Sequence, residues 1–220
     1  MWSMRQLEIK GYRNEPVTNT FFQQQAPARE IALVLPGVGY TCQMPLLYYP
    51  SRLLLSRGMD VVWVEYNYSR RPGYQSLSDA EQKEWLFADV TAAYQAAVEQ
   101  RAYSQVMLVG KSLSTLAMSH LLETVPQPVP IKAIWLTPLL RNSHVRTQIQ
   151  NGPRGLVVIG SADHHYDPAY LAEIQSKGNC EAVVVKGADH GMEIGDDVWQ
   201  SLQALEQVLR AVEQFVTPAP

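Results

Sequence analysis

The chain has 220 residues, of which 46% are hydrophobic and 18% are charged, and this composition predicts one α/β domain spanning residues 1–220. The net charge of -3 and the lack of an arginine or lysine block argue against nucleic-acid binding through phosphate charges. Two cysteines are too few for a disulfide framework, and no apolar run approaches the ~20 residues that span a bilayer. The N-terminus also lacks a signal-peptide pattern, so a cytoplasmic protein is predicted.

Short apolar runs alternate with segments of helical periodicity along most of the chain. Segments 7–10 and 18–23 suit an antiparallel hairpin at a sheet edge, with the turn at 14–16. The predicted elements then follow as strand 31–35, helix 45–57, strand 61–64, helix 79–100, strand 106–109, helix 112–124, strand 131–136, helix 142–150, strand 156–159, helix 168–176, strand 182–185 and helix 198–216. Continuous apolar strands between helices predict a mostly parallel sheet with helices on both faces.

The transition from the strand 106–109 to the next helix carries the strongest functional pattern. The strand ends at Gly110, and Ser112 follows before the helix begins. A tight turn of this kind lifts a nucleophilic serine above the end of a sheet, and small residues at Gly110 and Ser114 let strand and helix pass closely. Ser112 is also suited to cap the helix, so this pattern alone leaves both interpretations open.

An acid and a histidine follow two later strands. Asp163 comes just after the strand 156–159, and His190 lies in a glycine-flanked turn after the strand 182–185. A serine hydroxyl needs an imidazole to accept its proton, and the imidazole needs a carboxylate to fix its tautomer. We therefore predict Ser112, His190 and Asp163 as nucleophile, base and acid.

Other polar residues near Asp163 offer alternatives. Asp167 competes for the acid role, whereas Asp189 directly precedes the predicted base and is expected to shape that loop instead. His164 and His165 raise the question of a metal site beside Asp163. No spacing typical of metal ligands supports one, so we predict neither a metal nor another cofactor.

These motifs resemble those of the α/β-hydrolase superfamily. The resemblance rests on Gly110-Lys111-Ser112-Leu113-Ser114, Gly160-Ser161-Ala162-Asp163, Gly187-Ala188-Asp189-His190-Gly191 and Leu35-Pro36-Gly37-Val38-Gly39, the last in place of the usual His-Gly oxyanion loop. It extends from about Ile31 to the C-terminus and is strongest to small members, dienelactone-hydrolase-like or short carboxylesterase-like. It implies an α/β-hydrolase fold without a lid domain, because the connection between the strands 131–136 and 156–159 is short.

The resemblance also implies an oxyanion hole, formed by the backbone N–H groups of Val38 and Leu113. Tyr40, Met44 and the segment 69–77, with Arg70, Arg71, Pro72 and Tyr74, are candidates for the pocket walls. Cys42 is expected to be a buried, apolar residue rather than a pocket wall.

Lys111 stands directly before the predicted nucleophile. Its side chain is expected either to be solvated or to pair with an acid such as Glu65, and the sequence leaves both open.

The implied activity is hydrolysis of carboxylic esters or thioesters of small acyl groups through an acyl-enzyme. The expected partner is a small-molecule ester or thioester, and a homodimer is compatible with the resemblance. Because Ser114 replaces the second glycine of the usual motif, the alternative is a binding protein that keeps the fold with weak or no turnover.

Overall fold

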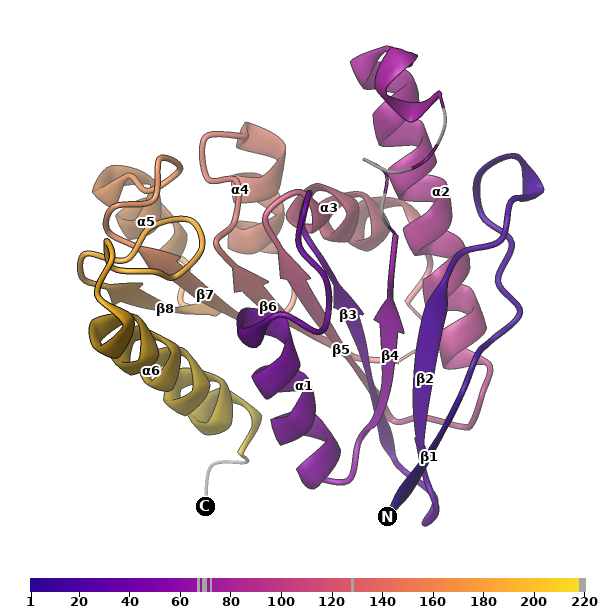
Figure 1. Cartoon of the computed structure of the whole chain (residues 1–220). Coiled ribbons are helices and arrows are strands. Elements are labelled where there is room, and N and C mark those ends of the chain that lie inside the picture. Colours follow the sequence, from indigo (N-terminus) through magenta and orange to yellow (C-terminus); the bar gives the residue numbers. More distant parts are fainter. Residues whose placement is uncertain (67, 69–70, 72, 128, 218–220) are drawn as a thin grey trace.

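The computed structural model describes residues 1–66, 68, 71, 73–127 and 129–217. These residues form an eight-stranded sheet in the order β1-β2-β4-β3-β5-β6-β7-β8, with helices on both faces (Figure 1). Strands β3 to β8 pair in parallel, whereas β1 and β2 join the edge next to β4 in antiparallel fashion. The predicted fold class, a mostly parallel sheet covered on both faces, is confirmed.

The strands are β1 (Trp2–Arg5), β2 (Asn19–Gln24), β3 (Glu30–Leu35), β4 (Asp60–Val64), β5 (Gln105–Lys111), β6 (Ile131–Leu136), β7 (Gly155–Gly160) and β8 (Cys180–Val185). The helices are α1 (Pro45–Ser56), α2 (Asp79–Val98), α3 (Ser114–Thr124), α4 (Ser143–Asn151), α5 (Pro168–Gln175) and α6 (Val198–Val216). Apart from the N-terminal hairpin, the predicted elements are confirmed to within two residues at each end.

The N-terminal hairpin lies at the sheet edge as predicted, but its first strand is β1 rather than the segment 7–10. The side chain of Asn19 accepts a hydrogen bond from the Leu7 amide at 2.8 Å and donates to the Leu7 carbonyl at 2.9 Å. These contacts occupy both backbone polar groups of Leu7, and Lys10 forms an isolated antiparallel bridge with Pro16. Both edges of β2 are already paired, with β1 and β4. The ring of Trp2 meanwhile packs on Phe22 at 5.2 Å, which anchors β1 beside β2.

Two apolar layers hold the helices against the sheet. Helices α1 and α6 cover one face through residues such as Leu54 and Val208, and α2 to α5 cover the other through residues such as Val90 and Ile149 (Figure 1). Burial on both faces explains why the central strands are continuous apolar runs.

The parallel arrangement brings the carboxyl ends of β5, β7 and β8 to one edge of the sheet. In the described part of the chain, α4 is the helix that connects β6 to β7, and no lid domain is inserted there. The loops at this edge therefore decide what surrounds Ser112.

No helix in the described part of the chain has the length and apolar character that crossing a membrane requires.

Candidate active site

A sharp turn between β5 and α3 carries Ser112. Its φ of 52° lies in the left-handed region, an uncommon conformation for a residue with a side chain. The turn is possible because Gly110 lacks a side chain: a Cβ there would lie 2.2 Å from Sδ of Met118 on α3. Helix α3 begins at Ser114 with Leu113 at its N-cap, so Ser112 is not the capping residue.

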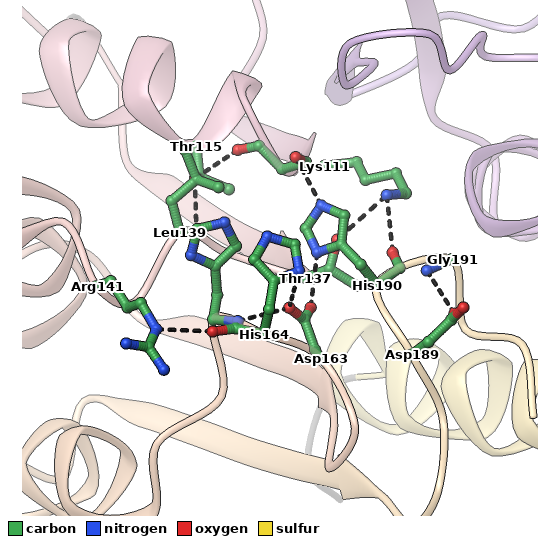
Figure 2. A network of polar contacts seen from close by, with 12 residues as sticks. Lys111, Thr115, Thr137, Leu139, Arg141, Asp163, His164, Asp189, His190 and Gly191 are labelled. Carbon is green, nitrogen blue, oxygen red and sulfur yellow. Dashed lines mark hydrogen bonds and ion pairs between the residues drawn. The ribbon is translucent and has the colours of Figure 1, made fainter.

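Ser112 and His190 lie side by side although 78 positions separate them in the sequence. The distance from Ser112 Oγ to His190 Nε2 is 2.8 Å, and His190 Nδ1 lies 2.7 Å from Asp163 Oδ2. The structure thus brings the three predicted residues into one continuous hydrogen-bonded chain. Figure 2 shows the imidazole of His190 directly beside the carboxylate of Asp163.

The carboxylate of Asp163 is fully buried and strongly hydrogen-bonded. Burial raises its pKa, but the hydrogen bond with His190 and the amide of His165, which donates to Oδ1 at 2.8 Å, outweigh burial and lower the pKa below its ordinary value. Asp163 therefore stays ionised at neutral pH, and a negative charge faces Nδ1 of His190.

The two alternative aspartates have other positions. Asp167 caps α5 by accepting a hydrogen bond from the Ala169 amide at 2.8 Å. Asp189 accepts from the amides of Gly191 and Glu193 at 2.7 and 3.0 Å, so it shapes the loop that carries His190, as predicted. Neither carboxylate belongs to the row of hydrogen bonds that links Asp163 through His190 to Ser112.

His164 stands next to the same carboxylate, with its Nδ1 3.6 Å from Asp163 Oδ1 (Figure 2). Asp163, His164 and His190 offer ligand atoms that all lie within 4.8 Å of one another, so they form a group able to approach a metal ion. Two of these residues are already joined, because Asp163 Oδ2 and His190 Nδ1 form a hydrogen bond of 2.7 Å.

A cavity of about 520 Å³ opens beside the loop after β3. Gly37, Val38 and Leu113 line it, so both residues predicted to supply the oxyanion hole border this space. Among the described residues, no group of the protein accepts a hydrogen bond from the N–H of Val38 or Leu113. Val38 is 71% exposed, which leaves this part of the loop open to solvent.

The predicted walls of this cavity are right in part. Tyr40, Tyr74 and Gln75 line it, whereas Met44 lines a neighbouring cavity with Met192. Arg71 instead borders a separate hollow near Trp85. Ser69, Arg70 and Pro72, also in the predicted wall, lie outside the described residues. Cys42 is fully buried, as predicted.

Two further tyrosines form the cavity wall and were missed by sequence reasoning. Tyr66 and Tyr68 follow β4 and stack at 4.8 Å, and Tyr68 stacks in turn on Tyr74 at 4.7 Å. The hydroxyl of Tyr68 donates to Asp89 at 3.0 Å and that of Tyr66 is bonded to Ser114, so both hydroxyls are engaged by the protein. The alternate spacing of two tyrosines, Tyr66 and Tyr68, directly after a buried strand was the available signal.

Ser114 has a structural use of its own. Its hydroxyl is fully buried, donates to the carbonyl of Pro36 and is also hydrogen-bonded to the hydroxyl of Tyr66. The serine that replaces the expected glycine therefore joins the start of α3 to the loop after β3. This loop contains Gly37 and Val38.

Replacing Ser114 with alanine is expected to lower the free energy of unfolding by about 1–3 kcal/mol, because the buried Pro36 carbonyl would lose its donor. Urea denaturation measures the change. Ser176→Ala is the matched control, since its hydroxyl also donates to a backbone carbonyl but is exposed, and about 0.5 kcal/mol or less is expected. Equal losses in the two variants would contradict this role of Ser114.

Lys111 fits neither of its predicted alternatives. It is 4% exposed and its Nζ donates to the carbonyl of His190 at 3.0 Å and to Thr137 Oγ1 at 3.3 Å. It is therefore not solvated, and its contacts are with neutral oxygens rather than with Glu65.

No family model matches the sequence, and no curated protein matches it either. Solved structures do match the fold. An esterase from Pyrococcus furiosus is 14% identical, with a TM-score of 0.68 over 98% of this chain and 92% of that chain. Est1E from Butyrivibrio proteoclasticus, solved with ferulic acid bound, is 13% identical, with a TM-score of 0.71 over 94% of this chain and 96% of that one.

An α/β serine hydrolase homologue from Coxiella burnetii is 14% identical, with a TM-score of 0.66 over 99% of this chain and 97% of that chain. The similarity to these structures spans nearly the whole chain. Together with the sheet order, it shows that this chain has the α/β-hydrolase fold in a form without a lid domain among its described residues.

Proposed function

We propose that the protein is a serine hydrolase that cleaves carboxylic esters or thioesters. The observation that carries the proposal is the continuous chain from Ser112 through His190 to Asp163, with contacts of 2.8 and 2.7 Å. A buried, ionised Asp163 holds the proton on Nδ1 of His190, so Nε2 is free to accept the proton of Ser112. The esterases and hydrolase homologues among the similar structures support the same class.

The reaction begins when Ser112 Oγ attacks the acyl carbonyl carbon and its proton moves to Nε2 of His190. The N–H groups of Val38 and Leu113 donate hydrogen bonds to the carbonyl oxygen and stabilise the negative charge that develops on it. Collapse breaks the bond to the leaving alcohol or thiol, which takes the proton from His190. Water then attacks the acyl-serine, His190 accepts a proton from it, and the acid departs as Ser112 regains its hydrogen.

The cavity favours a substrate with a small apolar group. Four tyrosines line it together with Val38, Leu86 and Leu113, and the hydroxyls of Tyr66 and Tyr68 are hydrogen-bonded within the protein. Polar side chains, among them Asp79 and Lys83, also line the cavity. Its volume of about 520 Å³ lies within the common range for small-molecule sites. The aromatic acid bound to Est1E supports testing aromatic as well as aliphatic acyl groups. The mechanism needs no cofactor.

Labelling with a fluorophosphonate tests the proposal, because this reagent reacts with activated serines. Intact mass and peptide mapping are expected to find one adduct, on Ser112, that is absent from Ser112→Ala and His190→Ala. Ser176→Ala is the control and is expected to label like the wild type. A panel of short aliphatic and aromatic p-nitrophenyl esters then follows. A folded wild-type protein that takes no label would overturn the proposal and favour the binding-protein alternative.

A further inference from the structure

A buried lysine directly precedes the proposed nucleophile. Lys111 is the last residue of β5 and is 4% exposed. Removing an ammonium group from water is unfavourable unless the protein replaces its lost hydrogen bonds. Among the described residues, no carboxylate lies within 4.0 Å of Nζ, so an ion pair does not supply this compensation.

Three neutral groups surround Nζ instead. They are the His190 carbonyl at 3.0 Å, Thr137 Oγ1 at 3.3 Å and the face of the Tyr40 ring, whose centroid lies 4.8 Å away. An ammonium has three N–H donors, so this arrangement gives each donor a partner. Figure 2 shows Lys111 extending across the site towards Thr137 and the His190 backbone.

The partners come from three separate segments. Thr137 follows β6, Tyr40 lies in the loop after β3, and His190 lies in the loop after β8. Lys111 therefore links the turn that carries Ser112 to the loop that carries its base. The position of the His190 imidazole depends on the position of the His190 backbone. The carbonyl of that backbone is one of the three groups that contact Nζ of Lys111.

We propose that Lys111 is a positioning residue, whose ammonium group holds the main chain of His190 so that the imidazole stays on Ser112. The inference rests on the proposed function only for its effect on turnover. The restraint on the His190 loop follows from the contacts themselves. A displacement of about 1 Å in a reacting group can reduce the rate by about 100-fold, so a weak restraint here has a large effect on turnover.

Protonation strengthens this restraint, because the ammonium has three N–H donors and a positive charge, whereas the neutral amine has two donors and no charge. Burial lowers the pKa of Lys111 to about 8, although the charges of Asp163 and Asp189 oppose that shift. Two other ionisable residues contact Lys111. Burial raises the pKa of Tyr40 to about 12, so its hydroxyl stays neutral. His190 contacts Nζ through its backbone carbonyl. The ammonium predominates below about pH 8, and the neutral amine, with its weaker hydrogen bonds, predominates above it. Turnover is therefore expected to decline as pH rises through about 8.

Lys111→Met preserves length and removes the charge and the donors. We expect kcat to fall by up to about 100-fold with KM nearly unchanged, and the decline near pH 8 to disappear. Thr137→Val should move that decline to lower pH because the ammonium loses an acceptor, whereas Thr137→Ser should leave it in place. Lys177→Met, at an exposed position, is the control and should match the wild type.

Two measurements separate this inference from the proposed function. One is the rate of fluorophosphonate labelling against pH, and the other is hydrogen exchange in residues 186–194, which does not need activity. Faster exchange of that segment in Lys111→Met supports the restraint even if the wild type takes no label. Wild-type exchange and labelling in Lys111→Met would overturn it while the hydrolase proposal stands. If Lys111→Met does not fold, an unshifted pH profile in Thr137→Val overturns it.

Discussion

Asp163→Asn is expected to lower kcat by about 10⁴-fold and to change KM little. The Oδ1 atom of asparagine can still accept from the His165 amide, which now donates to Asp163 at 2.8 Å. The amide nitrogen then faces Nδ1 of His190 and donates to it. The imidazole then carries its proton on Nε2, the nitrogen that faces Ser112. Nε2 therefore cannot accept the proton of the Ser112 hydroxyl. Steady-state kinetics on a p-nitrophenyl ester measures the loss.

Asp167→Asn is the matched control, because it makes the same chemical change four residues away. Asparagine is also a good N-cap, so α5 should keep its cap and kcat should stay near the wild-type value. The opposite result, with activity lost in Asp167→Asn and kept in Asp163→Asn, would move the acid role to Asp167. Circular dichroism of both variants shows whether the fold is retained.

Gly160→Ala is expected to lower the free energy of unfolding by about 3 kcal/mol and to remove most of the activity. A Cβ at this position would lie 2.0 Å from the carbonyl oxygen of Ala188 and 2.9 Å from that of Asp189. Both atoms belong to the backbone, so no side-chain rotation relieves the clash. The loop after β8 must move, and His190 moves with it. Urea denaturation and ester hydrolysis measure the two effects.

Gly178→Ala provides the comparison for Gly160→Ala. Gly178 has a φ of 74°, and nothing lies within 4 Å of an added Cβ. We expect a stability loss of about 1–2 kcal/mol from the left-handed backbone and no loss of activity. If Gly160→Ala behaves like Gly178→Ala in both assays, the close approach of the two loops is not what positions His190.

Much of this structure could be predicted because its sequence patterns are local. Apolar runs such as 131–136 mark buried strands, and the alternation of strands and helices fixes a parallel sheet. Glycine before Ser112 and glycines around His190 reveal tight turns within a few residues. Because these turns follow strands, their meeting at one sheet edge was also predictable.

Contacts between distant residues could not be predicted in this way. The burial of Lys111 depends on oxygens from Thr137 and His190, which belong to other strands' loops. Tyr66 and Ser114 show no local sign that they bond to each other. The first strand was misplaced for the same reason, since Asn19 binds the backbone of Leu7 across a loop. Polar pairing at long sequence separation leaves no periodic pattern.

The distance in sequence between Ser112 and His190 also affects the newly made chain. A ribosome adding about 5–20 residues per second needs roughly 4–16 s to cover those 78 positions. During that interval the proposed nucleophile has no base, because His190 has not yet been added. If the proposed function holds, the nascent chain cannot be acylated at Ser112, and this serine becomes reactive only when the loop after β8 reaches the sheet.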